Sequence, residues 1–235
     1  MFSTKKQLIK KTGKHGVGRF NFLQQLVTEY NVTKSRDAKE QVIANLANFA
    51  YDPINYDYLW RLKVIDLFFS ALEHKNKNIV SFAIGGICNI CLNPLHKQYI
   101  LRNNGIEIIS SLLTRSEESI ILSSITTLMY LNTPDTKNII ASRTNTERML
   151  EFSKSTNSRI KNLADIFLQD LCGIKQNKQS TSTITSDTEP STSNCTNTDI
   201  NQITIEDTSN TQSEDKQTNI ETNEIAHAST STITF

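Results

Sequence analysis

Residues 85–94 read GGICNICLNP, and residues 44–53, which lie 41 positions earlier, read ANLANFAYDP. Both stretches have an asparagine at the same position of the repeat, Asn48 or Asn89, among small and apolar residues, and both end at a proline. Their apolar residues recur at intervals of three and four, which is the spacing of one helix face. Because the residue before proline avoids the helical region, each helix is expected to end just before its proline. The same helical pattern therefore occurs twice, one period apart.

A further shift of 41 positions extends this pattern, because Ile84 then aligns with Ile125 and Ile87 with Leu128. Each complete unit is expected to form a short helix, a second helix and a longer third helix, and the first unit lacks the short one. A single unit cannot bury its apolar face, whereas stacked units share a continuous core. A period near 40 residues is typical of armadillo and HEAT repeats, so we expect a short all-α solenoid. The alignment defines four units, at residues 20–52, 53–93, 94–133 and 134–173.

Two pairs of residues give local signals in the expected third helices. Asp37, followed three residues later by Glu40, has the spacing of a capping box that opens the helix of the first unit. Gly85 and Gly86 stand inside the helix of the second unit, where each glycine costs about 1 kcal/mol relative to alanine. Either a neighbouring helix or a partner must therefore approach the backbone closely at this point.

Charge and composition divide the chain into three parts, although its net charge is only +1. Residues 1–19 hold six basic residues and no acidic one. Residues 174–235 hold 3 lysines and 9 acidic residues, and 36 of these 62 residues are Ser, Thr, Asn or Gln. A segment so poor in apolar residues cannot offset the roughly 1–2 kcal/mol per residue that ordering costs. We expect a basic flexible arm at 1–19, one repeat domain at 20–173 and a disordered acidic tail at 174–235.

Membrane and secreted proteins do not fit this sequence. The longest apolar run, residues 79–92, has 14 residues, which is shorter than the ~18–20 residues that span a bilayer. The basic N-terminus leads into polar, glycine-containing sequence instead of the apolar stretch of a signal peptide. The four cysteines are therefore expected to be reduced thiols in an intracellular protein.

No signature of an active site or a metal site is present in the sequence. Phosphate-binding, dinucleotide-binding, zinc-protease and serine-hydrolase motifs are all missing. Cys88 and Cys91 form a C-x-x-C pair with His96 nearby, but no second pair completes a tetrahedral zinc site. Small cysteines in an apolar helix are more often packing residues. We expect a protein that is not an enzyme and that holds no metal and no cofactor.

Several strings resemble a known family over about residues 17–173. The run of small residues around a central asparagine at residues 44–50 and 85–91 is similar to the third helix of armadillo repeats. Residues 37–53 and 82–92 resemble the armadillo repeat-containing protein 7 family, as do 124–129 and 162–168. This resemblance implies a nuclear component of the minor (U12-type) spliceosome in pre-mRNA splicing. It also implies an RNA-recognition-motif partner, RNA-binding motif protein 48.

The resemblance further points to a partner-binding face. In armadillo proteins the third helices line a concave face, where an asparagine amide can pair with the backbone of an extended peptide. The tryptophan that usually stands four residues earlier is replaced by Ala44 and Gly85. We therefore leave open that these asparagines instead bond the adjacent repeat. An alternative function is a peptide-binding carrier or signalling scaffold outside the spliceosome. The expected partner-binding residues are Asn45, Asn48, Asp52, Asn89 and Tyr130.

The basic arm is a second candidate contact. Lysine side chains can neutralise RNA phosphates, with an affinity that falls as salt rises. Nuclear import, or no role at all, would equally explain a basic terminus. Leu8 and Ile9 between the lysine pairs favour a short helix. The possible RNA-contacting residues are Lys5, Lys6, Lys10, Lys11 and Lys14.

Overall fold

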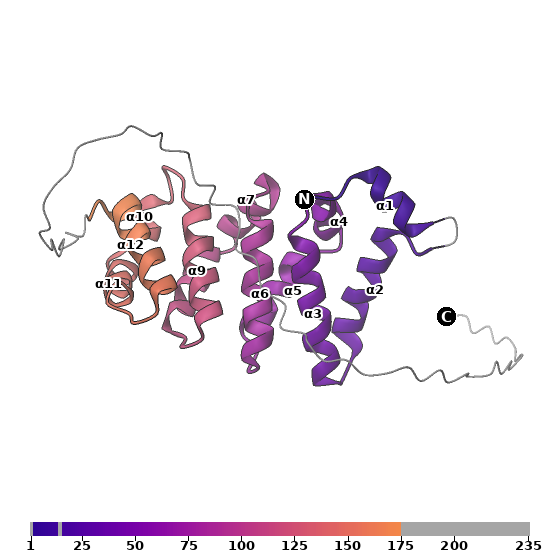
Figure 1. Cartoon of the computed structure of the whole chain (residues 1–235), viewed down its shortest axis with the longest axis horizontal. Coiled ribbons are helices and arrows are strands. Elements are labelled where there is room, and N and C mark those ends of the chain that lie inside the picture. Colours follow the sequence, from indigo (N-terminus) through magenta and orange to yellow (C-terminus); the bar gives the residue numbers. More distant parts are fainter. Residues whose placement is uncertain (1, 14–15, 175–235) are drawn as a thin grey trace, which may run out of the picture. The chain divides into compact units, whose positions relative to one another are not determined.

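The computed structural model describes residues 2–13 and 16–174, so most of the expected tail and Lys14 lie outside the described residues (Figure 1). Within these ranges all regular structure is helical and no strand is present, which confirms the all-α prediction. Every helix in these ranges is too short or too polar to cross a membrane. The helices are α1 (Lys5–Thr12), α2 (Arg19–Val32), α3 (Arg36–Ala50), η1 (Pro53–Asn55), α4 (Tyr56–Arg61), α5 (Val64–Leu72), α6 (Lys77–Ile90), α7 (Pro94–Arg102), α8 (Gly105–Ser111), η2 (Leu112–Thr114), α9 (Glu118–Leu131), α10 (Lys137–Ile140), α11 (Arg143–Phe152) and α12 (Ser158–Cys172).

The Asp-Pro and Asn-Pro pairs end one unit and begin the next. Asp52 and Asn93 follow the ends of α3 and α6, and each side chain then caps the helix after it. Asp52 Oδ1 accepts a hydrogen bond from the Ile54 N–H at 3.4 Å, and Asn93 Oδ1 accepts one from Leu95 at 3.0 Å. The proline at the first helical position loses nothing, because its missing N–H would have no partner there. These two residues therefore fix where one unit ends and where the next begins.

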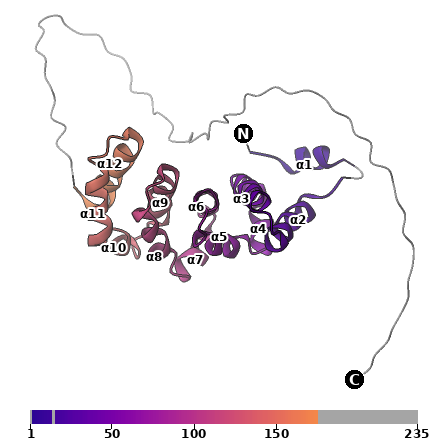
Figure 2. The ribbon, with the colours of Figure 1, turned by 90° about the horizontal axis from the view of Figure 1, so that it is seen from below.

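The third helices of the four units, α3, α6, α9 and α12, stack side by side as the inner row (Figure 2). The shorter helices, such as α4, α5, α7 and α8, lie on the other side of this row. The aligned residues Ile43, Ile84 and Ile125 are all fully buried, and they belong to one continuous core. The period found in the sequence is thus the spacing at which each unit contributes the same side chain to the core.

The two glycines of α6 have different surroundings. A Cβ atom on Gly86 would lie 2.4 Å from Cζ of Phe68, so α5 approaches α6 closely at this residue. The neighbouring-helix interpretation therefore holds for Gly86. Around Gly85, in contrast, no atom beyond its own helix lies within 4 Å of the position that a Cβ would take.

An aromatic cluster joins the short helices of the second and third units. His96 is fully buried between Trp60 and Tyr56, whose ring centroids lie 5.3 and 5.9 Å from its own. Its Nδ1 lies 3.1 Å from Asn93 Oδ1 and carries the proton, since that oxygen can only accept. Burial lowers the pKa of His96 to about 4, although Asp57 opposes the shift. The only tryptophan thus packs between repeats while staying 38% exposed.

The expected short helix of the N-terminal arm is α1. The Thr4 side chain accepts from the Gln7 N–H, and the Gln7 side chain accepts from the Thr4 N–H, which forms a complete capping box. Leu8 is the buried residue of this helix, and Ile9 is exposed. The lysines of α1 all point to its exposed sides.

Candidate partner-binding face

The non-buried side of the inner row is the candidate interaction surface, which we call the inner face. Three residues from each of α3, α6 and α9, at equivalent positions of the repeat, make up its central part, and all of them are exposed or half-buried. Of the five predicted residues, Asn48, Asn89 and Tyr130 lie on this face at equivalent positions of three successive helices. The inner face comprises Gln41, Ala44 and Asn48 on α3, Phe82, Gly85 and Asn89 on α6, and Ser123, Thr126 and Tyr130 on α9.

Asn48 and Asn45 differ in how freely their side chains could bond to a partner. The Asn48 side chain is exposed and makes no hydrogen bond to any described residue. Asn45 is half-buried and accepts a hydrogen bond from Gln41 Nε2 at 3.3 Å. The positions that correspond to Asn45 in the next two units, Gly86 and Thr127, are buried. Asn45 therefore lies beside the inner face and not in its central row.

Asn89 bonds to the adjacent repeat. Its Nδ2 donates to the backbone carbonyl of Ala47 on α3 at 3.2 Å. Its backbone carbonyl accepts from the hydroxyl of Tyr56, in the same unit, at 3.1 Å. The bond to Ala47 is the structural role that the sequence left open for the asparagine pair. The amide N–H of Asn89 is thus engaged within the fold, whereas that of Asn48 is not.

Asp52 holds the N-terminal segment. Its Oδ2 accepts a hydrogen bond from the Ser3 N–H at 3.0 Å, while Oδ1 caps η1. Beside it, the Phe2 ring lies 5.6 Å from the Tyr51 ring, centroid to centroid. Both carboxylate oxygens of Asp52 are therefore already used inside the chain.

Tyr130 is 41% exposed at the end of α9. Its backbone carbonyl accepts from Lys97 Nζ at 2.6 Å, so a lysine of the same unit satisfies the end of the helix. Partial burial raises the pKa of the phenol, and the sulfurs of Cys88 and Cys91 add to this effect. Tyr130 is therefore a neutral side chain with a part-buried ring and an accessible surface.

The C-x-x-C pair is built as a packing element. Burial raises the pKa of Cys88 to about 11 and that of Cys91 still further. Cys91 Sγ also donates to the Cys88 carbonyl at 3.0 Å. Among residues 2–13 and 16–174, no three His, Cys, Asp or Glu side chains come together as metal ligands would. Both thiols are protonated at neutral pH, which makes them poor nucleophiles and poor ligands.

A depression between α3 and α6 was not expected from the sequence. It has a volume of about 310 Å³ and is lined by Asp37, Glu40, Gln41, Ala44 and Phe82. The predicted capping box is wrong, because the side chain of Ser35, two residues earlier, caps α3 by accepting from the Ala38 N–H. Glu40 is thereby left free to reach across to the next unit.

The Glu40 carboxylate is held by two amides of that unit. Its Oε2 accepts from Asn76 Nδ2 and its Oε1 from Asn78 Nδ2, each at 2.7 Å. Asn76 is also the N-cap of α6, so it is fixed in place by the start of that helix. The carboxylate of one repeat is thus oriented by the beginning of the third helix in the next.

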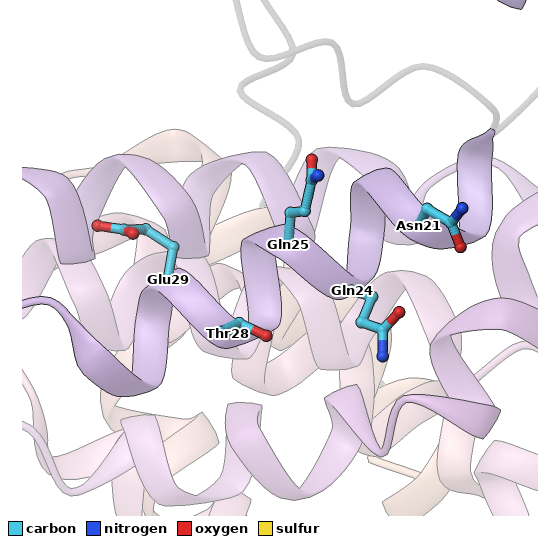
Figure 3. Close-up of a pocket in the computed structure, with 5 residues that line it drawn as sticks. All are labelled: Asn21, Gln24, Gln25, Thr28 and Glu29. Carbon is cyan, nitrogen blue, oxygen red and sulfur yellow. The ribbon is translucent and has the colours of Figure 1, made fainter. Parts of the chain in front are cut away.

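A second hollow, of about 650 Å³, runs along the outer side of α2 (Figure 3). The side chains lining it come from this one helix and are all polar, namely those of Asn21, Gln24, Gln25, Thr28 and Glu29. Such a surface is open on its other side and encloses no ligand site. It shows that the first helix of the stack turns a polar side outward.

On α1, the four lysines Lys5, Lys6, Lys10 and Lys11 are all exposed, and Lys14 lies outside the described residues. No ion pair involves these four lysines in the part of the chain that the structure describes. Their charges are therefore available to an anion.

The comparisons with known proteins agree with this architecture. No model of a protein family matches the sequence. The chain is 59% identical to armadillo repeat-containing protein 7 of Mus musculus over 162 residues, which make up 68% of this chain and 82% of that protein.

Solved structures of designed proteins share the fold at low identity. Computationally designed armadillo repeat proteins for modular peptide recognition match with a TM-score of 0.56 and 16% identity, over 63% of this chain and 63% of theirs. A designed armadillo repeat protein in complex with the peptide (KR)4 matches with a TM-score of 0.57 and 15% identity, over 63% of this chain and 64% of that one. The chain thus spans less than two thirds of these designed proteins, and the likeness confirms the armadillo type of solenoid.

Proposed function

The chain belongs to the armadillo repeat-containing protein 7 family, and from this premise we propose that it is a non-enzymatic adaptor of the minor (U12-type) spliceosome. In this proposal it acts in the nucleus, where its inner face binds an RNA-recognition-motif protein, RNA-binding motif protein 48. The pair then joins the minor spliceosome and takes part in pre-mRNA splicing.

One observation carries the choice of the inner face. Asn48 exposes a complete amide on that face, with both its donor and its acceptor free of described partners. A side-chain amide can bond to the N–H and the C=O of an extended segment at once. Tyr130, two repeats away, offers the exposed phenol ring that commonly anchors a protein interface. Asn48 and Tyr130 thus mark the two ends of a surface that three helices share.

The adaptor function is tested by a pull-down of the full chain from nuclear extract, with and without RNase, read by mass spectrometry. We expect one stoichiometric RNA-recognition-motif protein that survives RNase, together with minor-spliceosome components whose recovery depends on it. Recovery of transport factors or unrelated peptides instead would favour a carrier or signalling scaffold and contradict the splicing role.

The inner face is tested by the double substitution Asn48→Ala/Tyr130→Ala in binding to purified RNA-binding motif protein 48. We expect at least a tenfold loss of affinity, because an interface amide and an aromatic anchor are worth about 1–2 kcal/mol each. Asn21→Ala is the matched control, since this asparagine is also exposed but lies on the outer side of α2. Equal affinity of the double variant and the control would exclude the inner face.

We add to this proposal that α1 contacts RNA phosphates. Its exposed lysines support this role, because exposed and unpaired charges can each displace a counterion from RNA. Changing Lys5, Lys6, Lys10 and Lys11 to glutamine should weaken RNA crosslinking and flatten the salt dependence of binding. Unchanged crosslinking would leave RNA contact to the partner alone.

A further inference from the structure

We propose that the depression between α3 and α6 receives a cationic side chain, an arginine in the first place, from an extended segment of the partner. This inference deepens the proposed function and rests on it, since it takes the inner face as the partner-binding face. It names what the partner must carry, and it concerns residues other than the five predicted from the sequence.

The first argument is the unexplained glycine beside the depression. Gly85 lies one helical turn after Phe82, and its missing side chain leaves open space on the inner face. A helical glycine costs about 1 kcal/mol relative to alanine, and no packing contact within the described fold requires it here. The neighbouring Gly86 shows the contrast, because there the ring of Phe68 fills the space. The absence of a side chain at Gly85 therefore keeps the surface low enough for a segment from outside the fold.

The second argument is the charge inside the depression. Glu40 and Asp37 both line it, and neither forms an ion pair with any Lys, Arg or His among residues 2–13 and 16–174. The adjacent Lys39 is directed elsewhere, since its Nζ lies 4.9 Å from the centroid of the Tyr30 ring. The two carboxylates thus face the depression without a compensating cation, and an anion such as RNA would be repelled from it.

The third argument is that the carboxylate is already oriented. The amides of Asn76 and Asn78 fix both oxygens of Glu40, and each oxygen retains a lone pair for a second donor. A ligand therefore does not have to immobilise this side chain when it binds, which lowers the entropic cost of association. Hydrogen bonds to a charged group are also stronger than those between neutral groups.

The fourth argument is the apolar wall. Phe82 and Ala44 line the depression between the carboxylates and the centre of the inner face. A guanidinium group stacks on an aromatic ring with its flat face and donates in its plane, and its aliphatic stem packs against small apolar residues. Lysine would also supply a positive charge, but its ammonium group is not planar and cannot stack flat on the Phe82 ring. The combination of Glu40, Phe82 and the low surface at Ala44 and Gly85 therefore suits arginine best.

The experiment is an NMR titration of the isotope-labelled full chain with N-acetyl-arginine amide. The side-chain amides of Asn76 and Asn78 and the backbone amide of Gly85 report on the depression. We expect saturable shifts at these three positions with a Kd of about 1–10 mM, as suits a single side chain. N-acetyl-citrulline amide, which has the same shape without the charge, should bind at least tenfold more weakly. Equal shifts with both compounds, or no saturation up to about 50 mM, would overturn the proposal.

Two variants make the assignment specific. Glu40→Gln should abolish the arginine shifts, whereas Glu29→Gln, a matched change on the outer side of α2, should leave them intact. Because Glu40→Gln alters the contacts to Asn76 and Asn78, Ala44→Leu serves as a second variant. Ala44 lines the depression, so the larger side chain fills part of it without changing charge and should weaken arginine binding at least fivefold while the far-UV circular dichroism stays unchanged. Full binding in Ala44→Leu would place the ligand elsewhere and refute the site.

The partner assay separates this inference from the proposed function. If Glu40→Gln still binds RNA-binding motif protein 48 with unchanged affinity, the partner does not use the depression, so the inference fails and the adaptor function stands. If the wild-type chain does not bind that partner at all, the adaptor function fails, and the arginine titration still decides whether the depression accepts a cationic side chain.

Discussion

Replacing Gly85 and Gly86 by alanine, one at a time, should change stability in opposite directions. Alanine is favoured over glycine inside a helix by about 1 kcal/mol, because glycine loses more backbone entropy on folding. At Gly85 a new methyl group would meet no neighbouring atom within 4 Å. We therefore expect Gly85→Ala to stabilise the protein by about 1 kcal/mol, which for 150–250 residues raises Tm by about 2–4 °C.

At Gly86 the same gain is opposed by a collision. The new methyl carbon would lie 2.4, 2.6 and 2.9 Å from three ring carbons of Phe68, which is itself fully buried. Adding a methyl group to a filled core costs about 1–3 kcal/mol, so the net effect should lie between about 0 and 2 kcal/mol of destabilisation. The two variants should therefore differ by about 1–3 kcal/mol, although they change adjacent residues in the same way.

Urea denaturation followed by circular dichroism measures this difference directly. The midpoints should move apart while the slope with urea stays constant, since the surface exposed on unfolding is the same. Adding Phe68→Leu should cost less in the Gly86→Ala background than in the wild type, because the two changes share one contact. If Gly85→Ala destabilises the protein, the space beside Gly85 is occupied in the folded state, and the reasoning about an open inner face is refuted.

Three further predictions concern His96, Asn89 and Cys88. Lowering the pH from 7 to 5 should reduce the free energy of unfolding by about 2 kcal/mol because of His96. Over this range the unfolded ring, with a pKa near 6.5, takes up a proton, whereas the folded ring, with its pKa of about 4, stays neutral. His96→Gln should remove this part of the acid sensitivity in urea titrations at both pH values, and an unchanged pH dependence would contradict it. Asn89→Ala should lower the free energy of unfolding by about 1 kcal/mol in the same assay, because the hydrogen bond to Ala47 is lost. Asn48→Ala should change it by no more than about 0.5 kcal/mol. Equal losses in the two variants would argue against the inter-repeat bond. Cys88, whose pKa burial raises to about 11, should resist iodoacetamide at pH 8 until urea unfolds the chain, and rapid labelling in the native protein would show that the thiol is accessible.

The helical repeat could be predicted because its signals are local. Asp52 and Asn93 each stand before a proline and cap the following helix, so the end of one unit and the start of the next are written in two adjacent residues. Ile43 and Ile84 recur at the period because every third helix meets the core in the same way. The family resemblance of these strings agrees with the 59% identity to the mouse protein.

The contacts between repeats could not be predicted in the same way. Whether Asn89 faces a partner or the carbonyl of Ala47 depends on how closely α6 packs against α3, and the local sequence of neither helix specifies the distance between them. Glu40 fits a capping box in sequence, but Ser35 supplies the cap and leaves Glu40 to bond with Asn76 and Asn78, 36 and 38 residues away. The depression is formed by two helices together, so neither helix alone indicates it.

The polar outer side of α2 has a consequence for assembly. In a stack of similar units, the outer side of the first helix and the exposed side of the last resemble surfaces that elsewhere join neighbours, and apolar ends would let copies add head to tail into an open filament. Here Gln24 and Gln25 on α2 would lose their water at such a junction. Each polar side chain buried without a partner costs about 1–3 kcal/mol, so end-to-end polymerisation through this side of α2 is penalised.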